Sequence, residues 1–182
     1  MSNPKTLLNH RSGEAVDGTW RLDPARSSIE FRTAHFWGLI TVTGHFEVYE
    51  GQLDMSVDPA IELTVDANSV QTGNRKRDRH LRSADFFDAV NHPRMRFVSD
   101  SVELLADTLS VRGRLSARGA SIPLELQAQV GRVDGELQFE ATTVAPHREL
   151  GMSWSPLRMI SPRSELRIRA HLTPALEMDR AA

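Results

Sequence analysis

Seven histidines are the side chains in this sequence best suited to hold a metal ion, and they are scattered along the chain: His10, His35, His45, His80, His92, His147 and His171. No two of them have the four-residue separation that places two imidazoles on one helix face in zinc proteases. His35 and His45 could approach each other on neighbouring strands, but two ligands do not complete a site. The chain has no cysteine, which excludes disulfides and thiolate metal sites. We therefore expect no metal and no other cofactor.

A serine nucleophile is the second candidate for chemistry. The run Gly151-Met152-Ser153-Trp154-Ser155 matches the nucleophile elbow of serine hydrolases until its last position, where serine replaces glycine. An elbow also needs a parallel strand followed by a helix, and the surrounding sequence does not predict one. We interpret the run as a polar turn, and we expect no catalytic residues and no enzymatic activity.

A basic run is the third candidate, because Asp78 stands alone against five cations: Arg75, Lys76, Arg77, Arg79 and Arg82. Such a run could bind a lipid phosphate or RNA. It could equally form a solvated helix face in which Asp78 pairs with one of its basic neighbours. No RNA-binding aromatic sequence accompanies it. The whole chain, with 22 basic and 24 acidic residues and a net charge of −2, has no global attraction to nucleic acid or to an anionic membrane.

Most of the elements that must position these groups are predicted to be β-strands. Apolar and polar side chains alternate, with the period of a half-buried strand, over residues 28–35, 40–48, 61–65, 95–104, 109–115, 124–130, 137–143 and 166–172. Each segment has one apolar face to bury and sheet edges to hide, so the set must close on itself or stack. We predict an all-β fold, an antiparallel β-barrel of about eight strands.

The apolar faces of these segments supply the predicted interior. Its lining is Ile29, Phe31, Val42, Phe46, Leu63, Phe97, Val111, Leu126, Phe139, Ala141 and Ile168. The same faces carry small residues, namely Thr33, Gly44, Gly113, Ala128, Ala141, Thr143 and Ala170. An eight-stranded barrel can be filled by its side chains or can hold one slim ligand. The pattern alone favours a solid core, with small residues opposite large ones such as Phe31 and Phe97.

One segment interrupts the alternation and predicts a short helical insert at Asn74–Asn91. Asn74 is a good N-cap for a helix over 75–81, and Ser83 for a second helical turn over 84–89. Phe86 and Phe87, flanked by aspartates, suggest an apolar plug with a polar rim.

The insert also carries a spaced pattern: Thr72-Gly73-Asn74, Arg77-Asp78, His80-Leu81-Arg82-Ser83, Asp85-Phe86-Phe87-Asp88, Pro93 and Phe97. It resembles the signature block of the YceI-like family, lipocalin-like β-barrels that bind polyisoprenoid lipids. The resemblance implies a lipocalin-like barrel with an elongated apolar tunnel, which reverses the preference for a solid core. Arg26 replaces a histidine of the family pattern, and Pro146-His147 replaces an Asp-Arg pair.

The resemblance implies that the chain stores, transports or sequesters a long-chain amphiphilic lipid, a polyisoprenoid, bound non-covalently in the barrel interior. Head-group candidates at the rim are Arg77, Arg79, His80 and Arg82. Two alternatives come from other classes of protein. One is an enzyme acting on an isoprenoid or lipid in the same cavity, and the other is a nucleic-acid-binding module that uses the basic insert.

The domain organisation follows from composition and pattern. We expect a flexible N-terminal arm at 1–18, a barrel domain at 19–174 and a C-terminal tail at 175–182. The N-terminus lacks the apolar segment of a signal peptide, and no stretch reaches the ~18 apolar residues of a membrane span. We therefore expect a cytoplasmic protein with no stable membrane insertion and no nucleic-acid partner. The resemblance adds a homodimer to these expectations.

Overall fold

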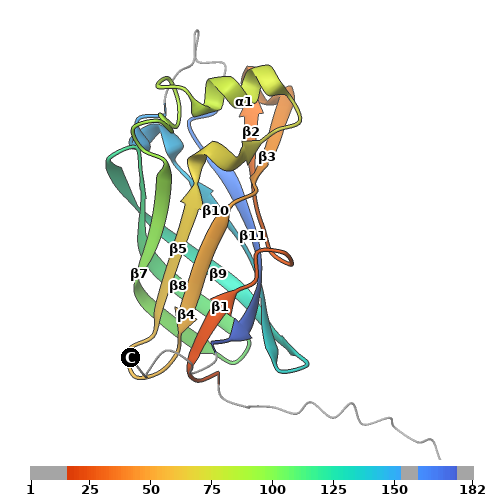
Figure 1. Cartoon of the computed structure of the whole chain (residues 1–182), viewed down its shortest axis with the longest axis vertical. Helices are drawn as coiled ribbons and strands as arrows, with labels where there is room; N and C mark the ends of the chain where they lie inside the picture. The colour runs from red at the N-terminus through yellow and green to blue at the C-terminus, as the bar shows by residue number, and fades with distance from the viewer. Residues whose placement is uncertain (1–15, 153–159, 176–182) are drawn as a thin grey trace, which may run out of the picture.

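The computed structural model describes residues 16–152 and 160–175, which form an antiparallel β-barrel with a helix at its upper end (Figure 1). The strands are β1 Thr19–Leu22, β2 Ser28–His35, β3 Ile40–Phe46, β4 Tyr49–Asp54, β5 Ala60–Asp66, β6 Val70–Gln71, β7 Arg94–Leu105, β8 Thr108–Ala117, β9 Ala120–Val133, β10 Glu136–Ala145 and β11 Ser164–Pro174. The helix is α1, Arg75–Arg82, and short 3-10 turns lie at Phe36–Gly38 (η1), Ala67–Ser69 (η2) and His147–Leu150 (η3). The predicted fold class is confirmed.

Eight strands close the barrel in the order β1-β4-β5-β7-β8-β9-β10-β11, and β11 pairs back with β1. β2, β3 and β6 extend the sheet from β11 at the upper end. The strands follow the predicted alternation. In β8, for example, Val111 is buried and lies between Val102 of β7 and Leu126 of β9, while Arg112 faces solvent.

Closure depends on β11, because one edge of this strand pairs with two others. Its residues Leu172–Pro174 pair with β1, and Glu165–Arg169 pair with β2. At the change of partner, the backbone of His171 is satisfied by the β1–β2 turn. Its N–H donates to Ser27 Oγ at 3.0 Å, and its carbonyl accepts from the Asp23 N–H at 2.8 Å.

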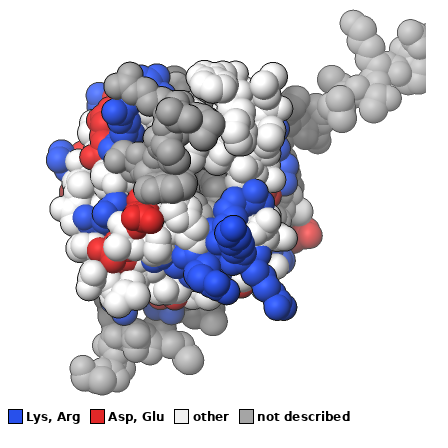
Figure 2. All heavy atoms as spheres, turned by 90° about the horizontal axis from the view of Figure 1, so that it is seen from above, with Lys and Arg blue, Asp and Glu red and all other residues white. Residues whose placement is uncertain are grey.

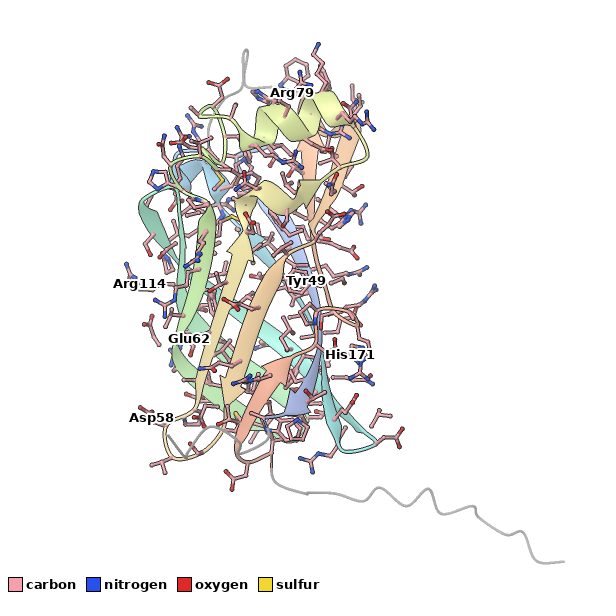
Figure 3. The ribbon with its side chains drawn as sticks, in the orientation of Figure 1. Tyr49, Asp58, Glu62, Arg79, Arg114 and His171 are labelled. Carbon is pink, nitrogen blue, oxygen red and sulfur yellow. The ribbon has the colours of Figure 1, made fainter. Side chains whose placement is uncertain are left out.

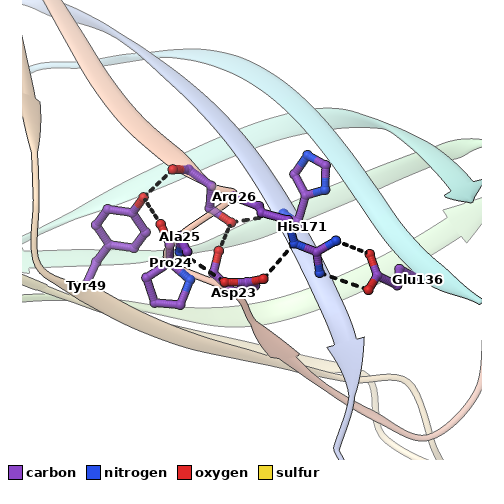
Figure 4. A network of polar contacts seen from close by, with 8 residues as sticks. Asp23, Pro24, Ala25, Arg26, Tyr49, Glu136 and His171 are labelled. Atoms are coloured by element: carbon purple, nitrogen blue, oxygen red, sulfur yellow. Dashed lines mark hydrogen bonds and ion pairs between the residues drawn. The ribbon is translucent and has the colours of Figure 1, made fainter.

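The turn itself is held by a polar network (Figure 4). The buried Tyr49 hydroxyl donates to the Ser27 carbonyl at 2.5 Å, and Ser27 Oγ donates to the Asp23 carbonyl at 2.7 Å. Arg26 bridges Asp23 at 2.6 Å and Glu136 at 2.6 and 2.8 Å. The arginine lowers the pKa of both carboxyls. Arg26, which departs from the family pattern, thus connects Asp23 and Glu136 on the outer surface of the barrel wall and not in its interior.

The insert is only partly helical. Asn74 caps α1 as predicted, accepting from the backbone N–H groups of Lys76 and Arg77 at 3.0 and 3.1 Å. The predicted second helical turn over 84–89 is wrong. Ser83 ends α1, with its hydroxyl donating to the His80 carbonyl, and Asp88 has a φ of 50°, in the left-handed region that ends a right-handed helix. Hydrogen-bonded turns follow the helix instead.

We predict that Ser27→Ala lowers the free energy of unfolding by about 1–2 kcal/mol, because the partly buried His171 N–H loses its acceptor. Urea denaturation checks this. Ser56→Ala is the control, since Ser56 is exposed and its side chain bonds only its near neighbour Asp54. It should change stability by less than about 0.5 kcal/mol. Equal effects of the two substitutions would show that the Ser27 contact contributes nothing to closure.

Candidate functional site

A cavity of about 270 Å³ occupies the barrel interior. Leu81 of α1 lies at its upper end, and Leu53 of β4 and Leu109 of β8 line it towards the lower end. A cavity of this size would hold many water molecules if it were polar, but its walls are mainly aliphatic and aromatic carbon. The interior therefore suits an elongated apolar molecule.

Every residue predicted for the lining does line this cavity: Ile29, Phe31, Val42, Phe46, Leu63, Phe97, Val111, Leu126, Phe139, Ala141 and Ile168. Their role in ligand binding stays a prediction. Several lining residues were not predicted, because they lie in α1, in η3 and in the turns and loops beside them, where no period of two points inward. These are Leu81, Phe86, Phe87, Leu150 and Met152.

The small inward residues behave in two ways. At Gly44 and Gly113 the missing side chain is replaced by a ring from the neighbouring strand. A Cβ atom would lie 2.4 Å from Cζ of Phe31 at Gly44, and 2.6 Å from Cζ of Phe97 at Gly113. The free space lies elsewhere, beside the alanines that β9, β10 and β11 contribute to the lining: Ala128, Ala141 and Ala170.

Aromatic rings cover the upper end of the cavity. The centroids of Phe31 and Phe46 are 5.7 Å apart, those of Phe46 and Phe87 are 5.7 Å apart, and those of Phe87 and Phe86 are 5.0 Å apart. The last two rings belong to the insert, where the sequence predicts an apolar plug, and both line the cavity. Arg118 holds this loop in place by donating to the carbonyls of Ala84 at 2.6 Å and Phe86 at 3.2 Å.

A polar group shares this upper end. His147 Nδ1 lies 2.9 Å from Ser164 Oγ, which lies 2.6 Å from Thr33 Oγ1, and all three residues line the cavity. Burial, and to a smaller extent the nearby His35, lower the pKa of His147 to about 4. The pKa of His35 is itself lowered, by burial and then by Arg77. His147 is therefore an uncharged polar group at neutral pH.

The four rim candidates divide into two pairs. Arg77 and His80 line the cavity, and Arg77 is fixed by donating to Thr72 Oγ1 at 2.8 Å and to the Thr72 carbonyl at 3.0 Å. Arg79 and Arg82 do not line it. Arg79 is exposed on α1 (Figure 3), and Arg82 donates to the Val70 carbonyl at 2.7 Å. Any head-group role of these residues stays a prediction.

Asp78 has a different partner from the one predicted. Its buried carboxylate accepts from the backbone N–H of Thr72 at 2.9 Å and from Thr72 Oγ1 at 2.5 Å, rather than forming an ion pair with a basic neighbour. The basic side chains on either side of it in the sequence are at least partly exposed. Asp78 thereby fixes the turn that leads into α1.

The other chemical candidates do not assemble into a site. Among residues 16–152 and 160–175, no group of three or more metal-ligating side chains lies together. His35 pairs opposite Ile40 and His45 opposite Glu30, so the two histidines sit at different heights on β2 and β3. The serine run at 151–155 lies mostly outside the described residues. No helix in the described part of the chain is long and apolar enough to cross a membrane.

We predict that Asp78→Ala destabilises the protein by about 1–3 kcal/mol, because the partly buried Thr72 donors lose a charged acceptor. Asp85→Ala is the matched control, since the Asp85 side chain is more than half exposed on the same insert. Thermal unfolding of the two variants checks this. Similar melting curves for Asp78→Ala and wild type would mean that the Thr72 turn is not held by this carboxylate.

We predict that His147 makes the protein less stable in mild acid. The unfolded chain binds a proton at this imidazole below pH ~6.5, whereas the folded chain does so only below about pH 4. Stability should therefore fall as the pH drops through this window, by up to about 3 kcal/mol. Urea titrations at both ends of the window should show a smaller pH dependence in His147→Gln. The exposed His45→Gln is the control, and an unchanged pH dependence in His147→Gln would contradict the prediction.

Known proteins share this barrel. The crystal structure of BcnA from Burkholderia cenocepacia superposes with a TM-score of 0.76 at 15% identity, covering 82% of this chain and 98% of that chain. A polyisoprenoid binding domain from Saccharophagus degradans superposes with a TM-score of 0.71 at 16% identity, covering 86% of this chain and 98% of that chain. At these identities the likeness shows the fold.

Sequence similarity shows the family. Protein YceI of Escherichia coli O157:H7 is 31% identical over 129 residues, which cover 68% of this chain and 67% of that protein. The family model of the YceI-like domain matches residues 20–172, which is nearly the whole span from β1 to β11. The chain therefore belongs to the YceI-like domain family.

Proposed function

We propose that this protein binds a long-chain amphiphile non-covalently, with the apolar chain of the ligand inside the barrel, and that the ligand is a polyisoprenoid. The observation that carries the proposal is the apolar cavity of about 270 Å³ running through the barrel interior. The solved neighbour from Saccharophagus degradans, which is described as a polyisoprenoid binding domain, has the same fold and supports this choice of ligand.

The physical basis for binding is the hydrophobic effect. Each methylene group removed from water contributes about 0.8 kcal/mol, so a long hydrocarbon chain needs few polar contacts to be held. Branched aliphatic and aromatic walls, such as Ile168, Leu126 and Phe139, offer dispersion contacts along the chain. Binding should therefore depend more on the length and width of the hydrocarbon than on any single hydrogen bond.

The distribution of polar groups gives the ligand a direction. His147, His35 and Arg77 all lie at the upper end of the cavity. The lower end is packed with apolar side chains, including the buried Trp20 and Leu137. We therefore place the polar end of the amphiphile under α1 and the free end of its chain towards Trp20.

This arrangement supports storage, transport or sequestration of the ligand. The alternative, an enzyme acting on the same lipid, would need an acid–base pair in the cavity. Glu62 is part of the cavity lining, but its carboxylate pairs with the exposed Arg96 at 3.1 Å and its side chain is nearly half exposed. Native mass spectrometry after gentle purification tests the function directly. A co-purified amphiphile is expected, and protein that never carries a lipid would contradict the proposal.

We predict that Ala141→Trp reduces the lipid carried by the purified protein while the fold survives. Ala141 lines the cavity opposite Ala128, so an indole there would enter space meant for ligand. Ala117→Trp is the matched control, because Ala117 is buried in the packed core on β8 and does not line the cavity. The control should lose about 1–3 kcal/mol or more of stability from overpacking.

The measurement pairs thermal unfolding with mass spectrometry of extracted lipid. Full lipid content in Ala141→Trp would show that the ligand lies elsewhere. Equal destabilisation of the two variants, with no lipid in the wild type, would indicate that the space around Ala141 is closed in solution.

A further inference from the structure

The connection between β2 and β3 exposes a run of large apolar side chains. Phe36 is 41% exposed, Trp37 77%, Leu39 84% and Ile40 51%. We call these four residues the apolar tip. Single exposed apolar residues are ordinary, but a contiguous group of this kind marks an interaction surface.

The backbone of the tip is held in an unusual conformation. Phe36 has a φ of 49° and Trp37 a φ of 57°, both in the left-handed region that bulky residues rarely adopt. Such local strain gathers at sites with a function. In this conformation the turn leaves the Trp37 side chain in solvent.

A basic surface lies at the same end of the barrel. Arg75, Lys76 and Arg79 are exposed on α1, and we call them the basic face. Seen from above, a group of basic side chains lies beside an uncharged part of the surface (Figure 2). The two surfaces lie at the same end of the barrel: His35, the residue before the tip, and Arg77 of α1 both line the cavity there, and Arg77 lowers the pKa of His35 electrostatically.

An anionic lipid bilayer fits both surfaces at once. Tryptophan and aliphatic side chains enter the boundary between head groups and hydrocarbon, while arginine and lysine contact the phosphates. A second copy of the chain fits less well, because a symmetric contact through this end would bring two basic faces together. Nucleic acid would leave the aliphatic Leu39 and Ile40 without a partner, since bases stack on aromatic rings.

We propose that the apolar tip and the basic face dock the upper end of this barrel on an anionic bilayer, without crossing it. The net charge of −2 does not oppose this, because α1 carries five of the 22 basic residues and, as its one acidic residue, the buried Asp78. If the proposed function is correct, docking also places the polar end of the cavity next to the membrane from which an amphiphile would be taken. The docking itself does not depend on a bound ligand.

Co-sedimentation with vesicles tests the proposal. The full chain is mixed with vesicles of phosphatidylglycerol and phosphatidylcholine in equal parts, and with vesicles of phosphatidylcholine alone. Wild-type protein should bind the anionic vesicles, and bind them more weakly as salt increases, because the attraction to the phosphates is screened. Binding to the neutral vesicles should be weaker by at least about tenfold, since each of the three cations of the basic face is attracted to an anionic surface and not to a neutral one.

Matched variants show whether vesicle binding depends on the apolar tip and the basic face, or on exposed apolar and basic residues anywhere on the barrel. Leu39→Ser should weaken binding to anionic vesicles several-fold, and Leu105→Ser should not, although Leu105 is 82% exposed at the turn between β7 and β8. Arg79→Gln should weaken it about fivefold. Arg114→Gln, on the flank of the barrel (Figure 3), should leave it unchanged. Circular dichroism confirms that each variant is folded.

The proposal would be overturned if wild-type protein did not sediment with anionic vesicles, or if Leu39→Ser and Leu105→Ser lost vesicle binding equally. It would also be overturned if light scattering showed that the apolar tip mediates self-association of a protein that does not bind vesicles. The Ala141→Trp variant distinguishes failure of membrane docking from failure of the proposed lipid binding. A variant whose cavity is blocked should still bind vesicles, so lipid loading and membrane docking can fail independently.

Discussion

The rest of the structure depends on closing the sheet along one edge of β11. An open sheet with these alternating faces would expose both its apolar side and its unpaired edges. β11 is longer than either partner on that edge, so it takes β1 at one end and β2 at the other. The change of partner would leave backbone groups unpaired at His171, and there Ser27 supplies the missing acceptor and Asp23 the missing donor. A closed interior, and therefore a cavity, exists because these few polar contacts complete the ladder.

Much of this architecture can be predicted from sequence, because apolar and polar residues alternate with a period of two in a strand that has one buried face. That period identified the lining residues from Ile29 to Ile168, and Asn74 identified the start of α1. The upper end of the cavity was less predictable. Nothing in the spacing of Arg118 or His147 shows that they meet the insert, since those contacts join segments distant in sequence. The pairing of Asp78 with Thr72 was missed because a nearby opposite charge seemed the stronger partner.

The chemistry of the interior follows from its polarity. Apolar walls favour hydrocarbon. Polar residues line the cavity under α1, among them His147 and Arg77, and others such as Gln52 and Glu62 lie elsewhere on its wall. His147 is kept neutral there by burial, with a pKa of about 4, so it offers hydrogen bonds without a charge that would need a counterion. Arg77 is a strong cation that lines the cavity at this end, and Thr72 holds its guanidinium in place. The upper end can therefore offer hydrogen bonds, while the walls below it are mainly apolar.

Two glycines that lie behind phenylalanine rings affect the width of the cavity. Gly44 and Gly113 do not line the cavity, yet Phe31 and Phe97 can lie flat against the wall only because no side chain stands behind them. A Cβ at Gly44 would have to displace the Phe31 ring, and a Cβ at Gly113 would meet the Val98 carbonyl oxygen at 2.4 Å as well as the Phe97 ring, so the strands would also have to shift. A change at either glycine would thus alter the shape of the cavity, although neither residue lines it.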